Sequence, residues 1–322
     1  MLILATADQV KSMVKAHIEG NDQKFRTIVL QIAAYEARQQ HTTFARELKN
    51  LIDKKYSNRR IISSNSKVSP LLQVTTPNVS LNDLVVSENI KIRIKRILSE
   101  YRNRKKLAGF GLKNRRKILI EGPPGTGKTF TASVIAAQTN QPLYTVQADR
   151  LMTKYMGETS VKLRQLFDSI RDNTGVYFFD EFDALGSERS LSNEVGEMRR
   201  ILNSLLQFIE GDDSDSIIIA ATNNSHLLDQ ALFRRFDDVL HYSLPKSNEI
   251  KKIFMQKLSV FQTNSTLSTN LFNFAQELSQ AEIVRVCDDA IKESILTDNP
   301  ITENQLKELI IERQSIYRGK EN

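Results

Sequence analysis

Short apolar runs alternate with longer amphipathic segments through the middle of the chain. The runs lie at residues 117–122, 142–147, 175–180, 216–223 and 239–245. Helical patterns, with apolar residues spaced three or four apart, lie between most of them. Strands that are apolar on both faces are typical of parallel sheets that helices cover on both sides. The pattern therefore predicts an α/β fold built on a parallel sheet.

Both ends of the chain have helical patterns. Residues 8–54 contain three helix-like segments, whereas residues 56–80 are rich in Ser, Asn and Thr and include Pro70 and Pro77, as linkers do. After Pro245 the pattern is helical to the end. We therefore expect a small helical N-terminal domain (1–55), a linker (56–80), an α/β domain (81–245) and a C-terminal helical domain (246–322).

Two helices of the α/β region are expected to dock on the core through apolar stripes. The first stripe consists of Val161, Leu163, Leu166, Phe167 and Ile170. The second lies in the basic segment 91–117 and consists of Ile92, Ile94, Ile97, Leu98 and Tyr101. The basic side chains of that segment could attract nucleic-acid phosphates, but we favour an ordinary solvated helix face.

Charge and cysteine content limit the environment of the protein. The chain has 322 residues, a formal net charge of +7 and a single cysteine, Cys287. One cysteine cannot form an internal disulfide, which suits a reducing compartment, and its helical context predicts a buried apolar role. The N-terminal apolar run is too short for a signal peptide, and no later stretch approaches a membrane-spanning length. We therefore expect a cytoplasmic protein without a membrane partner.

The segment EGPPGTGKT carries the clearest chemical signal. Its spacing, from Gly122 to Gly127, Lys128 and Thr129, fits the phosphate-binding loop G-x-x-x-x-G-K-[ST] between an apolar strand and a helix. The glycines allow backbone N–H groups to surround phosphates, and the helix N-terminus adds partial positive charge. Lys128 is expected to reach the β- and γ-phosphates, and the Thr129 hydroxyl to hold Mg²⁺. The remaining residues of this loop are Pro123, Pro124, Gly125 and Thr126.

Two further apolar strands end in polar residues. Asp180 and Glu181 follow the strand at 175–180, where a carboxylate would face the ligand crevice of a parallel sheet. Asp180 would organise Mg²⁺, and Glu181 would orient and deprotonate the attacking water. Asn223 ends the strand at 216–223, and its amide could position that water against the γ-phosphate; a turn asparagine is the alternative.

Two adjacent arginines, Arg234 and Arg235, precede an aromatic residue. Their planar cations suit a phosphoryl group in transfer, where charge spreads over several oxygens. The pattern leaves open whether they act on their own nucleotide or on that of a neighbour. A surface ion pair with Asp237 or Asp238 is the alternative.

In this order and spacing, the four motifs resemble the AAA+ ATPases, and most closely the AAA branch that remodels proteins. The resemblance covers about residues 80–322. It implies a parallel-sheet P-loop nucleotide-binding domain with a C-terminal helical lid, ATP and Mg²⁺ as cofactors, and homo-oligomeric, hexameric rings. Arg234 and Arg235 would then complete the site of the next subunit. The same resemblance implies that Asp83, Leu84 and Ala281 contact the nucleotide, whereas Gln280 stands where the family usually has glycine.

The segment from Lys154 through Tyr155 and Met156 to Gly157 resembles the loop that lines the central pore of such rings. An aromatic ring can grip extended polypeptide between its side chains, and a methionine adapts to varied shapes. The resemblance therefore implies that a protein substrate is threaded through the pore and that Tyr155 grips it. Packing of Tyr155 on its own helix is the alternative.

The sequence also resembles bacterial stand-alone AAA ATPases that work beside a subtilisin-like serine protease in defence against phage. No Ser-His-Asp constellation is readable in this chain, so proteolysis would need the partner. Our expectation is ATP hydrolysis that drives protein remodelling or unfolding by an oligomeric ring. The alternatives are a nucleic-acid motor or loader, which the basic segment 91–117 motivates, and a nucleotide-dependent scaffold that activates an effector.

Overall fold

The computed structural model describes residues 70–151, 158–182, 194–223, 233–259 and 267–318, and short helical stretches between residues 11 and 48. The chain divides into two compact units, residues 1–67 and 68–322. In the first unit the described residues are helical, and Ile28 and Ile32 pack with Met13, Phe25 and Leu48.

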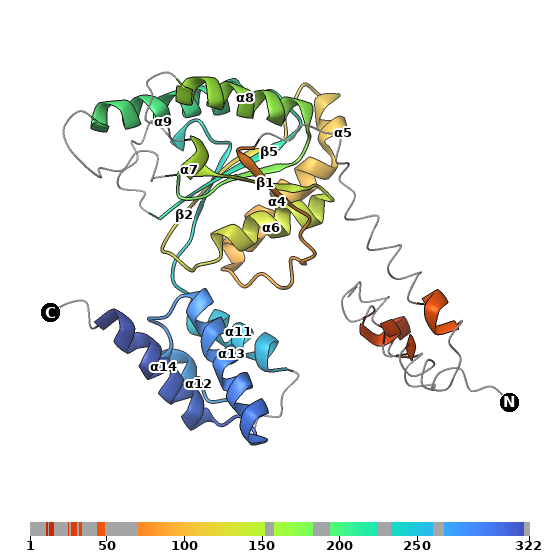
Figure 1. Ribbon diagram of the computed structural model, residues 1–322, viewed down its shortest axis with the longest axis vertical. Helices are drawn as coiled ribbons and strands as arrows, with labels where there is room; N and C mark the ends of the chain where they lie inside the picture. The colour runs from red at the N-terminus through yellow and green to blue at the C-terminus, as the bar shows by residue number, and fades with distance from the viewer. Residues whose placement is uncertain are drawn as a thin grey trace. The chain divides into compact units, whose positions relative to one another are not determined.

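A six-stranded sheet forms the centre of the second unit (Figure 1). Its strand order is β1-β3-β4-β5-β2-β6, and every neighbouring pair is parallel except β1 with β3. This arrangement confirms the predicted α/β class and the parallel sheet. The strands are β1 (Leu72–Thr75), β2 (Lys117–Glu121), β3 (Leu143–Val146), β4 (Val176–Phe179), β5 (Ile217–Thr222) and β6 (Asp238–His241).

Strand β1 lies inside the segment that we expected to be a linker. Leu72 to Thr75 pair antiparallel with β3, in register from Leu72 with Val146 to Thr75 with Leu143. The side chains of β1 alternate between half-buried and exposed, as expected for an edge strand, so this strand lacks the continuous apolar run that marks the central strands. The sheet therefore extends into residues 56–80.

Helices cover both faces of the sheet (Figure 1). On one face, Leu119, Tyr177 and Ile218 pack beneath α8 (Glu158–Asp172) and α9 (Glu194–Gly211). On the other face, Ile118, Phe178 and Ile219 pack against α4 (Glu88–Arg102) and α6 (Lys128–Thr139). Consecutive strand residues thus enter opposite cores, as the period of two requires. The helices of this domain are α4 (Glu88–Arg102), α5 (Arg104–Ala108), α6 (Lys128–Thr139), α7 (Ala148–Leu151), α8 (Glu158–Asp172) and α9 (Glu194–Gly211).

The predicted stripes on α4 and α8 are correct except for one residue in each. Ile92 and Val161 are exposed, whereas the other predicted residues of both stripes are buried and Ile90 joins the stripe of α4. Residues two apart on a helix lie about 200° apart around its axis. Ile92 is two residues from Ile94 and Val161 is two residues from Leu163, so neither can share its neighbour's face.

The C-terminal part of this unit is helical, as predicted, and has its own core. Its helices are α11 (Ser247–Leu258), α12 (Thr269–Phe274), α13 (Gln280–Thr297) and α14 (Glu303–Arg318). Phe254, Leu271, Ile283 and Leu306 are fully buried in that core together with Cys287. Burial raises the pKa of the Cys287 thiol to about 12, which confirms the predicted apolar role because a thiol that stays protonated is a poor nucleophile.

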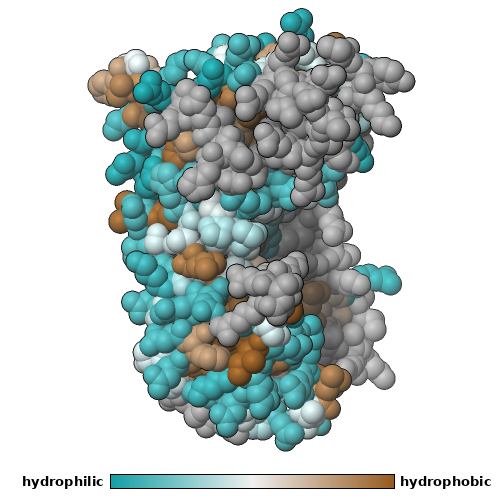
Figure 2. All heavy atoms as spheres, turned by 90° about the vertical axis from the view of Figure 1, so that its left-hand side faces the viewer, coloured by the Kyte–Doolittle hydropathy of each residue, from teal (hydrophilic) through white to brown (hydrophobic). Residues whose placement is uncertain are grey.

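The described surface is mainly hydrophilic on the face shown in Figure 2, where hydrophobic residues occur in small separate groups. Scattered exposed apolar residues are ordinary for folded proteins. Among the described helices, none combines the length and the apolar character that crossing a bilayer would need.

Candidate nucleotide site

Three neighbouring strands end at the same edge of the sheet. In the parallel register Phe179 lies beside Ala220, and Glu121 lies beside Thr222. The residues that directly follow these strands, Gly122, Asp180 and Asn223, therefore come together although they are far apart in sequence. This is the carboxyl edge of the parallel strands, where ligands bind in open α/β sheets.

The phosphate-binding loop leaves β2 at this edge and leads into α6. Gly122 has a φ of 149°, and a Cβ at this position would overlap the backbone of Tyr242, the residue after β6. Gly125 and Gly127 have φ values of 75° and 97°, in the left-handed region that favours glycine. The loop thus has the backbone conformation that the predicted phosphate-binding motif requires.

Lys128 lies under the loop with its side chain folded back toward it. Its Nζ donates to the carbonyl oxygens of Gly122 at 2.7 Å and Pro123 at 2.9 Å, and to Asn223 Oδ1 at 2.6 Å. The bond to Asn223 connects the ends of β2 and β5. The structure therefore brings Asn223 to the loop, which favours the predicted site role over a simple turn.

Asp180 is bonded to Thr129, the residue that follows Lys128. Its Oδ2 accepts a hydrogen bond from the Thr129 hydroxyl at 3.1 Å, and its Oδ1 accepts one from the Glu181 backbone N–H at 3.0 Å. Glu181 has a φ of 49°, which is uncommon for a residue with a side chain and often marks functional sites, and its side chain is exposed at this edge. Thr129 and Asp180, the predicted Mg²⁺ ligands, are thus neighbours.

The helical domain reaches the loop through the turn that starts α13. The Ala281 N–H donates to the Gly125 carbonyl at 2.9 Å, and a Cβ at Gly125 would lie 3.0 Å from the Ser279 Cβ. The predicted contact residue Ala281 is therefore at the site. Leu84 is also near, because its Cδ1 would lie 4.0 Å from a Cβ at Gly127.

Asp83 lies in a turn beside Leu84. Its carboxylate accepts a hydrogen bond from the Ser80 N–H at 2.7 Å, and its own N–H donates to the Ser80 carbonyl at 3.1 Å. The turn thus holds the chain that carries Leu84. The side chain of Asp83 stabilises this turn, and its predicted nucleotide contact stays a prediction.

Arg234 and Arg235 lie at the opposite edge of the sheet. The Asp237 N–H donates to the carbonyl of Lys117, the first residue of β2, at 2.8 Å, whereas the phosphate loop follows the last residue of that strand. At about 3.3 Å per residue, Lys117 and Gly122 are roughly 16 Å apart. An arginine side chain is too short to cross that distance, so these arginines do not serve the phosphate loop of their own chain.

The two arginines differ from each other. Arg234 is exposed, whereas the Nε of Arg235 lies 3.6 Å from a carboxylate oxygen of Glu210, near the end of α9. The expected partners are engaged elsewhere: Asp238 pairs with Arg93, and Asp237 accepts the backbone N–H groups of Arg116 and Lys117. An ion pair thus exists at Arg235, but not with the acids that the sequence pointed to.

Sequence reasoning missed two residues of these edges. Glu210 gives no local signal, because it meets Arg235 only after the chain has passed through β5. Tyr242 was read only as part of a strand, yet its hydroxyl lies 2.6 Å from the Thr131 hydroxyl of α6 and its backbone packs on Gly122. Burial raises the pKa of Tyr242, so its hydroxyl stays protonated.

Several predicted residues lie outside the described part of the chain. They include the complete pore-loop segment, Lys154, Tyr155, Met156 and Gly157. Its flanks are described, because α7 ends at Leu151 and α8 begins at Glu158.

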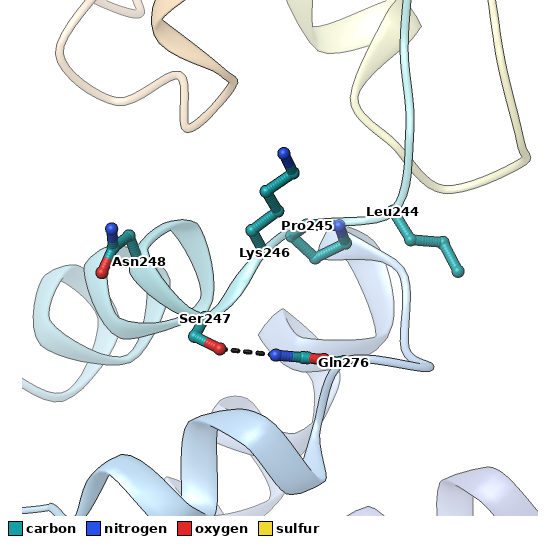
Figure 3. Close-up of a pocket in the computed structure, with 6 residues that line it drawn as sticks. All are labelled: Leu244, Pro245, Lys246, Ser247, Asn248 and Gln276. Carbon is teal, nitrogen blue, oxygen red and sulfur yellow. Dashed lines mark hydrogen bonds between the residues drawn. The ribbon is translucent and has the colours of Figure 1, made fainter.

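A pocket of about 540 Å³ lies where the chain passes from the α/β domain into α11 (Figure 3). Ser247 and Gln276 point toward each other across it, and the Gln276 Nε2 donates to Ser247 Oγ at 2.6 Å. Leu244, Pro245, Lys246 and Asn248 complete its lining. None of the predicted nucleotide ligands lines this pocket, so we do not assign it to the nucleotide.

The residues at the loop fit a nucleoside triphosphate with Mg²⁺. The glycine conformations expose backbone N–H groups, and Lys128 provides a cation at the start of α6. Thr129 and Asp180 provide the hard oxygen donors that Mg²⁺ prefers.

Comparison with known proteins decides the family. The model of the ATPase family associated with various cellular activities (AAA) matches residues 118–244. Over 304 residues the chain is 34% identical to y4kL of Sinorhizobium fredii, an uncharacterized AAA family ATPase, and the match covers 91% of this chain and 90% of that protein. The chain belongs to the AAA family of ATPases. As a member of that family, it hydrolyses ATP.

Other AAA proteins match over the ATPase region. The ATP-dependent zinc metalloprotease FtsH of Parabacteroides distasonis is 33% identical over 66% of this chain, and the peroxisomal ATPase PEX6 of Candida glabrata is 33% identical over 67%. The match spans only 32% and 22% of those proteins, respectively. The crystal structure of the FIGL-1 AAA domain superposes with a TM-score of 0.58 at 24% identity, covering 75% of this chain and 85% of that one, which supports the AAA fold.

Proposed function

We propose that this AAA ATPase works as a homo-oligomeric ring, with six subunits, that uses ATP hydrolysis to remodel or unfold proteins. The observation that carries the proposal is the position of Arg234 at the edge of the sheet opposite the phosphate loop. An arginine that cannot reach its own nucleotide but is exposed can reach the nucleotide of an adjoining copy. Hydrolysis then requires two chains at each site.

Each residue of the loop edge has a defined part in the proposed reaction. Lys128 and the loop N–H groups bind the phosphates, while Thr129 and Asp180 hold Mg²⁺, which when bound offsets charge on the phosphate oxygens. Glu181 takes a proton from the attacking water, and Asn223 orients that water. Arg234 and Arg235 of the neighbouring copy stabilise the charge that develops on the transferring group.

The segment Lys154–Gly157 is proposed to grip the substrate, with Tyr155 contacting extended polypeptide in the pore. Support comes from its sequence resemblance and from its place between α7 and α8 in the chain. The two described flanks also contact each other, because Lys162 of α8 donates its Nζ to the Arg150 carbonyl of α7 at 2.7 Å. This bond joins α7 to the first turns of α8.

Two measurements test this proposal. The mass of the Glu181→Gln protein with ATP and Mg²⁺, from light scattering, should correspond to a closed oligomer; a monomer at all concentrations would remove the ring. Tyr155→Ala should keep ATP hydrolysis but lose the unfolding of a fluorescent protein that carries an unstructured tail. Tyr155→Phe, the matched control, should unfold it, because the aromatic ring is retained. Unimpaired unfolding by Tyr155→Ala would contradict the gripping role.

The proposal also includes a subtilisin-like serine protease as partner and a part in anti-phage defence. Both rest on the resemblance of the sequence to bacterial stand-alone AAA ATPases that work beside such a protease. A pull-down with the Glu181→Gln protein in ATP should retain both substrate and protease. A pull-down without any protease would remove that partner. Cytoplasmic location is proposed from the single, buried Cys287.

The nucleic-acid alternative has less structural support. Arg93, Arg115 and Arg116 of the basic segment form ion pairs with Asp238, Glu100 and Asp212, respectively, which offsets part of its positive charge. Hydrolysis stimulated by DNA would nevertheless favour a motor or loader. If the protein is instead a scaffold that activates an effector, Tyr155→Ala should leave effector activation unchanged, whereas Arg235→Ala should change it.

A further inference from the structure

Tyr242 connects the two ends of the phosphate loop. Its backbone lies against the first glycine of the loop, because a Cβ at Gly122 would overlap it. Its N–H donates to the carbonyl of Glu121, the residue before the loop, at 2.7 Å. Its side chain reaches the other end, where its hydroxyl lies 2.6 Å from the Thr131 hydroxyl in the first turn of α6. One residue at the end of β6 thus links the start of the loop with the helix that follows the loop.

The hydrogen bonds around Thr131 have a single consistent direction. The Thr131 hydroxyl donates to the Gly127 carbonyl at 2.9 Å, and this bond uses its only hydrogen. The bond between the two hydroxyls must therefore take its hydrogen from Tyr242. The bonds run from Tyr242 through Thr131 to Gly127, the last glycine of the loop, whose φ of 97° is left-handed.

The two hydroxyls lie in the packed core on the side of the sheet that α4 and α6 cover. Thr131 is fully buried, and Tyr242 is 5% exposed. Apolar side chains of the same shape could fill this space at little cost in stability, so packing alone does not account for the hydroxyls. Each buried hydroxyl must keep its partner, which fixes the geometry of the pair. The pair therefore holds Gly122 and Gly127 in one relative position.

We propose that Tyr242 is a positioning residue of the nucleotide site, which holds the two ends of the phosphate loop in the conformation that receives the phosphates. It does not touch the nucleotide but acts through Gly122 and through Thr131. The proposal rests on nucleotide binding by an AAA ATPase, and it requires neither a ring nor protein remodelling. It can therefore fail while the proposed function stands, and the reverse also holds.

Calorimetric titration of the full chain with ADP tests this role with side chains of matched shape. Tyr242→Phe and Thr131→Val each remove one hydroxyl of the pair, and each should weaken ADP binding roughly three- to tenfold, the usual effect of one hydrogen bond. The double variant should bind ADP no more weakly than either single variant, because both substitutions break the same link. Thr131→Ser keeps the hydroxyl and should bind ADP as the unchanged protein does.

Denaturant unfolding without nucleotide separates positioning from stability. Thr131→Val leaves the Tyr242 hydroxyl buried without an acceptor, so it should be less stable than Tyr242→Phe. The double variant has no unpaired hydroxyl, and it should regain part of the stability that Thr131→Val loses. Stability and ADP affinity should therefore diverge, because the double variant regains stability but not affinity.

Tyr177→Phe is the matched control. The Tyr177 hydroxyl is also buried and donates to the Asn173 carbonyl at 2.6 Å, but Tyr177 lies on the other face of the sheet, in the core beneath α8. This variant should lose stability, as Tyr242→Phe does, and should bind ADP normally.

Three results would overturn the assignment. The first is ADP binding by Tyr242→Phe equal to that of the unchanged protein. The second is an ADP affinity that follows the stability of the variants, with recovery in the double variant, as a purely structural role requires. The third is an equal loss of affinity in Tyr177→Phe. Failure of the unchanged protein to bind ADP would contradict the nucleotide site as a whole, and this assignment with it.

Discussion

The two edges of the parallel sheet carry charged groups of different kinds. At the carboxyl edge, Lys128, Asn223, Thr129 and Asp180 bond to one another or to the loop, so this half of the site is preformed within one chain. At the amino edge, Arg234 is exposed and Arg235 meets Glu210. One chain thus brings the predicted phosphate and Mg²⁺ ligands together at one edge of its sheet, whereas its own Arg234 and Arg235 lie at the other edge.

This division has a simple geometric cause. In parallel strands all carboxyl ends lie together, so residues that follow β2, β4 and β5 meet at one edge. Residues that precede β6 must lie at the other edge, because β6 is parallel to β2. No side-chain rearrangement can bring Arg234 to its own phosphate loop, since the length of the strand separates them.

The largest expected effect is that of Arg234→Ala. Hydrolysis should fall by roughly 10³-fold or more, the usual contribution of an arginine supplied to a phosphoryl transfer. ADP affinity should not change, because ADP lacks the γ-phosphoryl group that the neighbour's arginine would stabilise. Arg171→Ala, at an exposed position on α8, is the control and should leave hydrolysis unchanged.

Mixing two inactive variants tests whether Arg234 acts on the nucleotide of a neighbouring chain. Lys128→Ala chains lose nucleotide binding but keep Arg234, so mixing them with Arg234→Ala chains should restore part of the ATPase rate. Absence of any recovery, under conditions where mixed oligomers form, would mean that the two edges do not act across chains.

Glu181→Gln should reduce turnover by about 10²-fold or more while ATP remains bound, because the amide cannot take a proton from water. Steady-state phosphate release and equilibrium nucleotide binding measure the two halves of this prediction. Glu308→Gln, at an exposed position of α14, is the control. Normal turnover in Glu181→Gln would remove the assigned role of this residue.

Asp212→Ala should destabilise the amino edge. The Asp212 side chain is fully buried and pairs with Arg116, so its removal leaves a buried charge and should lower the free energy of unfolding by about 3–5 kcal/mol. Asp168→Ala removes the exposed pair with Arg171, at 3.9 Å, and should cost less than about 1 kcal/mol. Denaturant unfolding measures the free energy of unfolding of both variants. Equal losses would contradict the larger contribution expected of the buried pair.

The smallest effect concerns the contact between the helical domain and the loop. Gly125 and Gly111 have nearly the same φ, 75° and 73°, so alanine at either position should cost about 1 kcal/mol of stability or somewhat more. Only at Gly125 does the new Cβ meet Ser279, whereas nothing lies within 4 Å at Gly111. Gly125→Ala should therefore weaken ADP binding and Gly111→Ala should not; equal affinities would argue against a tight contact.

Local sequence features could predict some elements better than others. The central strands were found because they are buried on both faces and read as continuous apolar runs. Strand β1 was missed because an edge strand that is only half buried has no such run. Ile92 and Val161 were misplaced because a count of apolar residues does not by itself fix the face of the helix on which each one lies.

The sequence by itself determined the α/β class, the helical C-terminal domain and the phosphate loop, because each depends on residues close together in the chain. Only the tertiary structure decided which of the polar strand ends meet, since that depends on the strand order. It also decided that Arg235 pairs with Glu210 and that Arg234 lies at the edge of the sheet opposite its own phosphate loop. Contacts of this kind join residues far apart in sequence, and no local pattern of polar and apolar positions records them.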